Sequence, residues 1–406
     1  MSEPVRLKHK MKLPWHVTLL SGAFHARKRQ LYVVGGAVRD SLLDQHPKDF
    51  DLATDALPDE IIEILSDLRD DEACAITPTI IEVGKSFGVI KAIFKPVMDF
   101  GIKVKGIELE IATFRSDIGA GRRPDSVEFT SIEKDVMRRD LTINALFYDV
   151  ATREVVDYVG GIEDIKQGVV RTVGSPKERF AEDRLRVLRA VRFAAQMSCE
   201  LDLDTFQAIK RNPTLDGVSP ERIRDEFLKC IAKTKSMTYL SFLLTRLNLW
   251  EAIFPEFVIM ASNVREVRDP MQFLAMIIAR EEIPGYVADE LNKLKYTSAE
   301  VKQVIFYKEF AESATYDALR TPNILHKAFV NSGVTPEALR RFSKLKTRPE
   351  QFFVDAFLEY TPTVRGDTLM ALGFKGKELG VELAQREAVL FGRLLDEHRT
   401  KHQKST

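Results

Sequence analysis

The stretch from Leu31 to Thr54, LYVVGGAVRDSLLDQHPKDFDLAT, constrains the fold more than any other part of this chain. Its opening apolar run predicts a buried strand, and the glycine pair that follows predicts a tight turn into a helix. A second predicted strand carries Asp49 and Asp51 on one face and Phe50 on the other, because alternate strand residues point in the same direction. The stretch therefore predicts two strands joined through a helix, with two carboxylates side by side.

Paired carboxylates and a glycine turn suggest a site for a metal ion and an anion. Two acids on a rigid strand repel each other unless a cation neutralises them, and Mg2+ prefers oxygen ligands while keeping positions open for substrate phosphates. Gly35 and Gly36 would let backbone N–H groups approach an anion at the helix N-terminus. Acids spaced by one residue also occur at ordinary strand ends, so the pair alone does not establish catalysis.

A third acid is expected on a neighbouring strand, which the pattern predicts for residues 107–114. Glu108 and Glu110 share one face of that strand. Glu110 is the better candidate and Glu108 the competitor. The third acid would complete a two-metal site, in which one metal ion activates a hydroxyl and the other holds triphosphate oxygens.

Composition narrows the class of protein. The chain has 406 residues, which is enough for several domains, and its 45% hydrophobic and 30% charged content is typical of a soluble globular protein. The formal net charge is zero, so nucleic-acid binding would depend on local clusters of Arg and Lys. Three widely spaced cysteines predict no disulfide framework. Without a signal-peptide core or an apolar run near the ~20 residues of a membrane span, a cytoplasmic protein without membrane contact is expected.

Strand and hairpin patterns occupy the first part of the chain and helical patterns the rest. Residues 1–30 are a basic lead-in in which a helix is predicted, and the pattern of residues 79–94 predicts a hairpin. Residues 115–126 are Gly-rich and basic and predict a loop. After Ser175-Pro176 the β patterns end and amphipathic helical periodicity continues to the C-terminus. The expected fold class is α+β, a mixed sheet with helices followed by an all-helical region.

Arg138, Arg139 and Asp140 form a charged cluster beside Thr142 and Asn144. A cluster of this kind is usually a solvated group of charges at a helix end. Here two further hydrogen-bonding side chains lie within about one helical turn of the arginines, which favours a binding role.

An arginine-rich segment, PKERFAEDRLRVLRAVRFAAQ, spans Pro176 to Gln196. A surface helix with ion pairs would also explain it, but such a helix more often mixes Lys with Arg, and Arg is suited to phosphate and to planar contact with a base edge. An Asp and an Arg side by side offer an acceptor and a donor fork that could read the Watson–Crick edge of a nucleobase. Four polar residues recur at every third position of this predicted helix: Asp183, Arg186, Arg189 and Arg192.

Five ordered motifs between residues 31 and 230 resemble one known family. They are GGAVRD with DFDLAT, then RRDLTINA, DYVGG, EDRLRVLR and SPERIRDEFLK. In this order they closely resemble the class II tRNA nucleotidyltransferases, or CCA-adding enzymes, and the bacterial poly(A) polymerases. A weaker resemblance to tRNA-specific bacterial members continues at residues 365–380.

The resemblance implies a polymerase-beta-type nucleotidyltransferase head followed by three helical parts. The head would be a palm with a mixed sheet. The neck would carry the nucleotide-selecting helix, and the tail would bind tRNA. The implied boundaries are 1–160 for the head, 161–235 for the neck, 236–335 for the body and 336–406 for the tail.

The resemblance also implies roles for individual residues. Asp49 and Asp51 would bind Mg2+ and activate the RNA 3′ hydroxyl, with Glu110 as the third catalytic acid. Asp183 and Arg186 would select C and A by base-like hydrogen bonds, so no nucleic-acid template would be needed. Gly35, Gly36 and Arg39 would bind the triphosphate. Arg139 and Asn144 would also bind the nucleotide, with Arg138 as a second candidate. Arg189 and Arg192 would neutralise phosphate or brace the pocket.

The implied activity is the addition of C and A residues to tRNA 3′ ends from CTP and ATP, with contacts to the 3′ end and the acceptor/T arm. One departure from the family lies in the loop at residues 115–126, where Ala120 precedes Gly121 and the usual acid is absent. That loop helps the switch from C to A addition in the family. CC-only addition, A-only addition and poly(A) synthesis therefore stay open. A catalytically silent RNA-binding protein is a separate alternative, and the intact Asp49 and Asp51 argue against it. The sequence predicts no oligomeric state.

Overall fold

The computed structural model describes residues 3–70, 78–99, 102–104, 106–118, 126–260, 267–279, 283–313, 321–345 and 350–404. The chain forms two compact units, Met1–Gly217 and Val218–Thr406. The boundary between them falls inside the predicted neck, residues 161–235. The division into head, neck, body and tail therefore stays a prediction.

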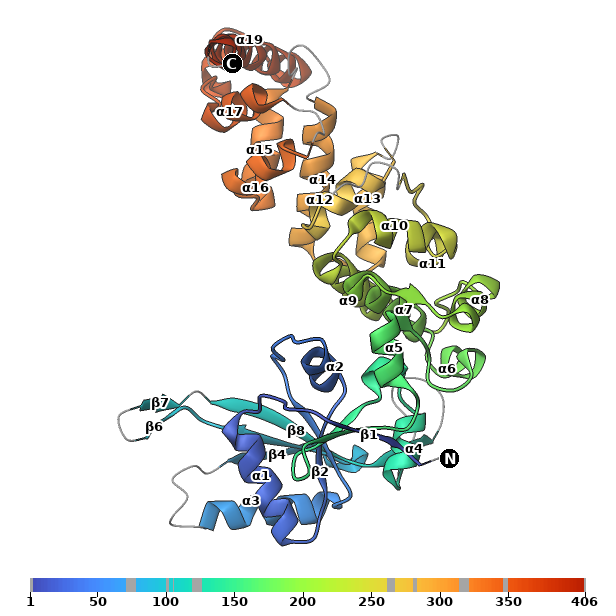
Figure 1. The fold of residues 1–406 in the computed structure, drawn as a ribbon. Helices are drawn as coiled ribbons and strands as arrows, with labels where there is room; N and C mark the ends of the chain where they lie inside the picture. The colour runs from blue at the N-terminus through green and yellow to red at the C-terminus, as the bar shows by residue number, and fades with distance from the viewer. Residues whose placement is uncertain are drawn as a thin grey trace. The chain divides into compact units, whose positions relative to one another are not determined.

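The first unit is built on an eight-stranded mixed sheet (Figure 1). The strand order is β1-β12-β11-β2-β3-β8-β5-β4. β3 and β8 run parallel, whereas β2 pairs with β3 and β5 pairs with β8 in antiparallel fashion. The mixed sheet expected for the head is confirmed. Its strands are β1 Val5–Lys8, β2 Leu31–Val34, β3 Asp51–Thr54, β4 Thr79–Gly84, β5 Val89–Phe94, β8 Ile107–Thr113, β11 Phe147–Asp149 and β12 Glu154–Asp157.

Helices α1, Trp15–Ala26, and α3, Pro58–Asp70, lie together against one face of this sheet (Figure 1). Val33, Leu52 and Ile111 point toward them and are at most 1% exposed. Because strand residues alternate between faces, the residues next to these in sequence point to the opposite face. The core thus determines which face carries the predicted acids.

The opposite face carries a smaller apolar cluster. Tyr32, Val34 and Ala53 pack there with Phe147, next to helix α4, Ile132–Met137. Helix α2, Gly36–Leu42, instead contributes Ala37 and Val38 to the main core. A short 3-10 turn, η2 Thr142–Asn144, connects α4 to β11. The motif RRDLTINA therefore runs along the face on which Asp51 lies.

Four helices and a small parallel strand pair complete the first unit. The helices are α5 Gly161–Gln167, α6 Pro176–Glu182, α7 Leu185–Met197 and α8 Leu203–Arg211, and the pair is β13 Val169–Val170 with β14 Glu200–Leu201.

Several predicted elements differ from the observed ones. Asp49 precedes β3 and does not belong to the regular strand. The predicted single helix at 176–196 is two helices, because Asp183 has an extended backbone, with φ −150° and ψ 106°. The structure also places β1 in the basic lead-in and β14 beyond Ser175, where no strand was expected. The two unexpected strands are short and form by pairing with partners distant in sequence, β1 with β12 and β14 with β13.

The predicted loop at residues 115–126 is also wrong in part. Arg115–Ile118 is strand β9, and it pairs with β10, Ser126–Phe129. The segment 119–125, which contains Ala120 and Gly121, lies outside the described residues. A further hairpin, β6 Val97–Asp99 with β7 Ile102–Val104, extends between β5 and β8.

The second unit is helical, as predicted. Its aromatic core includes Phe306, Phe310 and Phe357, with centroid separations of 5.6 Å for Phe306–Phe310 and 5.1 Å for Phe310–Phe357. Within the described ranges, no helix is both long and apolar enough to cross a membrane. The helices are α9 Pro220–Lys233, α10 Met237–Arg246, α11 Trp250–Ile253, α12 Pro270–Ile277, α13 Pro284–Lys293, α14 Ser298–Ser313, α15 Pro322–Ser332, α16 Pro336–Ser343, α17 Gln351–Glu359, α18 Gly366–Ala371 and α19 Gly376–Gln403.

Candidate active site

The two central acids lie at the start of β3. Asp49 and Asp51 are exposed and Phe50 between them is 7% exposed, so the predicted alternation holds even though Asp49 precedes the strand. Asp51 is directly opposite Glu110 in the parallel register of β3 and β8. Desolvation by the surrounding protein raises the pKa of Asp51, as do the charges of Glu110 and Asp49, against a smaller opposing effect of Arg139. The sheet thus gathers negative charge at this point.

Lys91 on β5 holds the third predicted acid. Its Nζ lies 2.8 Å from Glu110 Oε1 and 2.8 Å from Glu108 Oε1. Glu108 and Glu110 share a face, as predicted, but both form ion pairs with the same lysine. Among the described residues, no group of three or more His, Cys, Asp or Glu side chains is arranged to hold a metal ion. The structure thus places Glu110 beside Asp51 without making it a third ligand in a common cluster.

The glycine turn after β2 has the predicted form. Gly35 has φ +70°, a conformation that favours glycine, and its N–H donates to the Leu146 carbonyl at 3.1 Å. Gly36 begins α2 directly after it. A Cβ built at Gly36 would lie 3.5 Å from Arg39 Nη2, so the Arg39 guanidinium lies against the turn.

Arg39 is 5% exposed, which is unusual for an arginine. Its Nε and Nη2 donate to Asp40 Oδ1 at 2.9 and 2.6 Å, and its Nη1 donates to Asn144 Oδ1. The structure thus brings the predicted residues Arg39 and Asn144 together, although they are far apart in sequence.

A buried acid, Asp135, holds the two predicted arginines of the RRD motif. Arg138 Nε donates to Asp135 Oδ1 at 2.9 Å and Arg139 Nη2 to Asp135 Oδ2 at 2.9 Å. Arg139 also stacks on Phe147, with 4.6 Å from Cζ to the ring centroid. Burial alone would raise the pKa of Asp135, but the two guanidiniums outweigh it and hold the pKa below its usual value. Asp135 is not among the site residues predicted from the sequence, although its position three and four residues before the arginines on a helix was a usable signal.

The arginines of α7 contact the RRD motif. Arg186 Nη2 donates to the Arg138 carbonyl at 3.0 Å, and Arg189 Nε donates to Asp140 Oδ2 at 2.7 Å. Arg192 is 5% exposed, so the surface-helix interpretation of this segment is wrong.

Asp183 lies at the break between α6 and α7. Its Oδ1 accepts a hydrogen bond from the Leu185 N–H at 3.1 Å. Arg186 Nη1 pairs with Glu182 Oε2 at 2.6 Å on the other side of the break. The break therefore places Asp183 in an extended segment immediately before the helix that carries the arginines.

The DYVGG motif packs against the segment that carries RRDLTINA. The Asp157 carboxylate accepts hydrogen bonds from the N–H groups of Val159, Gly160 and Ile162 at 3.0, 2.9 and 2.8 Å. A Cβ built at Gly161 would lie only 2.2 Å from the Thr142 carbonyl oxygen. The motif therefore lets the start of α5 pack directly against the RRDLTINA segment.

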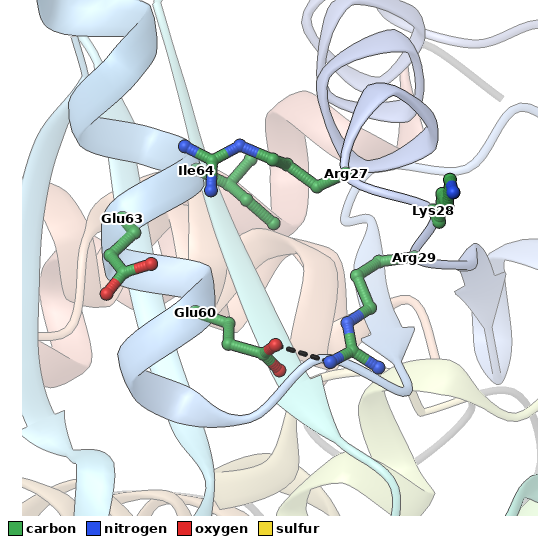
Figure 2. Close-up of a pocket in the computed structure, with 6 residues that line it drawn as sticks. All are labelled: Arg27, Lys28, Arg29, Glu60, Glu63 and Ile64. Atoms are coloured by element: carbon green, nitrogen blue, oxygen red, sulfur yellow. Dashed lines mark hydrogen bonds and ion pairs between the residues drawn. The ribbon is translucent and has the colours of Figure 1, made fainter.

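A cavity of about 310 Å3 lies on the other side of the sheet, between the end of α1 and α3 (Figure 2). Arg27, Arg29 and Glu60 are among its lining residues. Arg29 pairs with Glu60, and Arg27 pairs with Asp67, so acids neutralise its arginines. The cavity is separate from the acid pair and does not belong to the candidate active site.

The mixed sheet, the glycine turn and the acid pair define the head of a nucleotidyltransferase. Residues 31–171 match the poly A polymerase head domain, and residues 200–260 match the probable RNA and SrmB-binding site of polymerase A. These two regions and the relatives named below make the chain similar to CCA-adding enzymes and bacterial poly(A) polymerases. The recognised resemblance is therefore confirmed.

The similar proteins include both CCA-adding enzymes and poly(A) polymerases. The chain is 37% identical to the CCA-adding enzyme of Ligilactobacillus salivarius over 66% of this chain and 60% of the relative. It is 36% identical to poly(A) polymerase I of Salmonella typhi over 56% of this chain and 47% of that relative. The chain thus spans about half to three-fifths of the length of these relatives.

Two solved structures share the fold of almost the whole chain. The Bacillus stearothermophilus CCA-adding enzyme in complex with CTP has a TM-score of 0.64 at 24% identity, covering 97% of this chain and 100% of that one. The Thermotoga maritima CCA-adding enzyme complexed with tRNA has a TM-score of 0.61 at 18% identity, covering 99% and 100%. The expected architecture, a nucleotidyltransferase head followed by helices, is therefore confirmed.

Proposed function

We propose that this protein is a template-independent RNA nucleotidyltransferase that adds C and A residues to tRNA 3′ ends from CTP and ATP, using Mg2+. The observation that carries the proposal is the contact between the RRD motif, which follows the acid-bearing sheet, and the arginine helix α7. Arg186 and Arg189 reach the Arg138 carbonyl and the Asp140 carboxylate, respectively. The proposed reaction site and the proposed base-selecting segment both consist of residues of one compact unit, Met1–Gly217.

Asp49 and Asp51 fit a hard divalent cation. Both are exposed in the folded chain, and the pKa of Asp51 is raised first by desolvation and then by the charge of Glu110. Carboxylate oxygens are the ligands that Mg2+ prefers, and it completes its coordination with water and substrate phosphates. When bound, Mg2+ would supply activation of the RNA 3′ hydroxyl and neutralisation of triphosphate charge. Glu110 is the proposed third catalytic acid, held next to Asp51 by strand register and by Lys91.

The proposed triphosphate site lies at the glycine turn. Gly35 and Gly36 bring backbone close to an incoming anion, and the buried Arg39 adds positive charge directly against the turn. A Cβ at Gly35 would lie 3.8 Å from Arg139 Nη1, so Arg139 also borders this turn. Cationic groups held in place before the reaction stabilise developing charge without reorganisation.

The proposed base-selecting site is formed by Asp183 and Arg186, and Arg189 and Arg192 lie further along α7. An ionised carboxylate accepts hydrogen bonds and a guanidinium donates them, so the pair can match the edge of C or A. Contacts to Glu182 and to the Arg138 carbonyl orient Arg186. Asn144 contributes through its hydrogen bond with Arg39.

Poly(A) synthesis is the second candidate function. It is favoured by the similarity to poly(A) polymerase I and by Ala120, where CCA-adding enzymes usually carry an acid. CC-only and A-only addition are the narrower versions of the leading proposal. We propose that the helical unit Val218–Thr406 supplies contacts to tRNA in the leading case.

An extension assay distinguishes these functions. Purified protein is given tRNAs that end before CCA, after one C and after CC, each with CTP, ATP or both. The proposal predicts C addition to the first two, A addition to the third, and a completed CCA end with both nucleotides. Long A tails on unrelated RNA would favour poly(A) synthesis. Failure to join A to the CC-ended tRNA would reduce the activity to CC addition.

A further inference from the structure

Phe193 on α7 is surrounded by three of the arginines described above. The distance from the guanidinium Cζ to the ring centroid is 4.8 Å for Arg39, 4.1 Å for Arg192 and 5.8 Å for Arg189. Phe193 is 6% exposed, and Arg39 and Arg192 are 5% exposed. Desolvated cation–π contacts are stronger than exposed ones, so this ring is a substantial anchor for buried positive charge.

A chain of polar contacts links the same arginines by a second route. Arg39 Nη1 donates to Asn144 Oδ1, and Asn144 Nδ2 lies 3.5 Å from Asp140 Oδ1. Asp140 Oδ2 accepts from Arg189 Nε at 2.7 Å. The chain runs from the glycine turn through the RRD motif to α7, and Phe193 closes it into a ring by contacting both Arg39 and Arg189.

The chemistry of the ring differs from that of the acids nearby. Asp40 pairs with Arg39 and Asp140 pairs with Arg189, so these carboxylates neutralise part of the arginine charge and use some of the N–H groups. An aromatic face attracts a guanidinium through its quadrupole while carrying no net charge. Phe193 therefore contacts the faces of the same guanidiniums without neutralising them further and without using their N–H groups.

We propose that Phe193 is a positioning residue that sets Arg39, at the triphosphate turn, relative to Arg189 and Arg192 on the base-selecting helix. The inference rests on the proposed function, because it assigns the two groups of arginines to the two ends of one nucleoside triphosphate. Phe193 itself touches no reacting atom in this account. Its effect is on binding of the nucleotide as a whole.

The test compares four variants of the full chain. Phe193→Leu and Phe193→Met remove the ring at similar apolar volume, and Phe193→Tyr keeps it. Phe24→Leu on α1 is the matched control, because Phe24 is fully buried in the main core on the other sheet face. KM and kcat for CTP on a tRNA ending before CCA are measured together with calorimetric affinities for CTP and for inorganic tripolyphosphate.

The expected result is a rise of roughly tenfold in KM and in the CTP dissociation constant for Phe193→Leu, the size of a buried cation–π contact, with kcat nearly unchanged. Phe193→Tyr should stay near the parent, and Phe24→Leu should lower the melting temperature without changing KM. Tripolyphosphate should lose less affinity than CTP, because it spans only the Arg39 end. If Phe193→Leu does not fold, Phe193→Met provides the same comparison.

Two results would overturn the inference: Leu and Met variants with the parent KM and CTP affinity, or a Phe193→Tyr variant as impaired as Phe193→Leu. Failure of the proposed function is a separate observation, since the parent would then add no C to tRNA. The calorimetric comparison of CTP with tripolyphosphate would still decide the role of Phe193 in that case.

Discussion

Buried carboxylates, rather than the exposed acid pair, hold the arginines of the site in place. Asp135 binds Arg138 and Arg139, and Asp140 binds Arg189. For both acids burial would raise the pKa, but the facing guanidiniums outweigh it and lower the pKa. Each acid is thus ionised in the folded protein, and each converts flexible arginine side chains into fixed donors.

Replacing Asp135 with Asn should lower the free energy of unfolding of the first unit by about 2 to 3 kcal/mol, because it weakens charge-assisted hydrogen bonds to a buried acid. The folded pKa of Asp135 is below its ordinary value of 3.8, so its stabilisation is present above that value and is lost as pH falls through the folded pKa. Parent stability should therefore fall more steeply than that of Asp135→Asn below about pH 4. Thermal melting at pH 7, 5 and 3.5 measures this. Glu337→Gln, which affects only an exposed pair with Arg341, serves as the control.

Lys91 should influence how the acids respond to Mg2+. Replacing it with Gln releases Glu110 from its ion pair beside Asp51, which increases the negative charge there. The Mg2+ concentration for half-maximal stabilisation in thermal melting should fall roughly twofold to fivefold, the scale of exposed ion pairs. Lys85→Gln, which disrupts pairs with Asp59 and Glu82, should leave it unchanged. Equal Mg2+ dependence in parent and Lys91→Gln would contradict the coupling of Lys91 to the acids.

At the scale of elements, the site depends on close approach between α5 and the segment before β11. Gly161 begins α5, and its Cα lies so close to Thr142 that no Cβ fits. Gly161→Ala should destabilise the protein by roughly 1 to 3 kcal/mol, as overpacking does, and should weaken CTP binding by displacing the RRD motif. Gly285→Ala on α13 is the matched control, because a Cβ there meets nothing within 4 Å. Melting curves and calorimetric CTP titration test both effects, and equal behaviour of the two variants would argue against this packing.

Elements with strong local signals were predicted correctly and those determined by distant partners were not. The apolar run at β2 and the glycine pair after it are local features, and both formed as expected. The break at Asp183 contains neither Pro nor Gly, so no local residue pattern predicted it. Likewise β1 forms by pairing with β12, which is distant in sequence: Val5 lies opposite Asp157. The Lys91–Glu110 pair follows from strand register, which the sequence pattern did not define.

At the scale of the whole molecule, every predicted site residue lies in the unit Met1–Gly217. The unit Val218–Thr406 contributes helices and an aromatic core, and its part in RNA binding is a proposal. Family motifs, and not periodicity, led to the proposal that the acid pair and the arginine segment serve one site. The contacts that link Arg39 to the arginine segment, through Asn144, Asp140 and Phe193, depend on side-chain positions that no sequence pattern specifies.

The central claim is that one set of residues performs nucleotide transfer and another selects the base. Incorporation of each of the four nucleoside triphosphates onto a tRNA ending before CCA tests it most directly, in the parent, Asp51→Ala and Asp183→Ala. We expect C alone in the parent, no transfer by Asp51→Ala with tRNA binding retained, and transfer with relaxed nucleotide choice by Asp183→Ala. Turnover near the parent level in Asp51→Ala, or unchanged selectivity in Asp183→Ala, would contradict it.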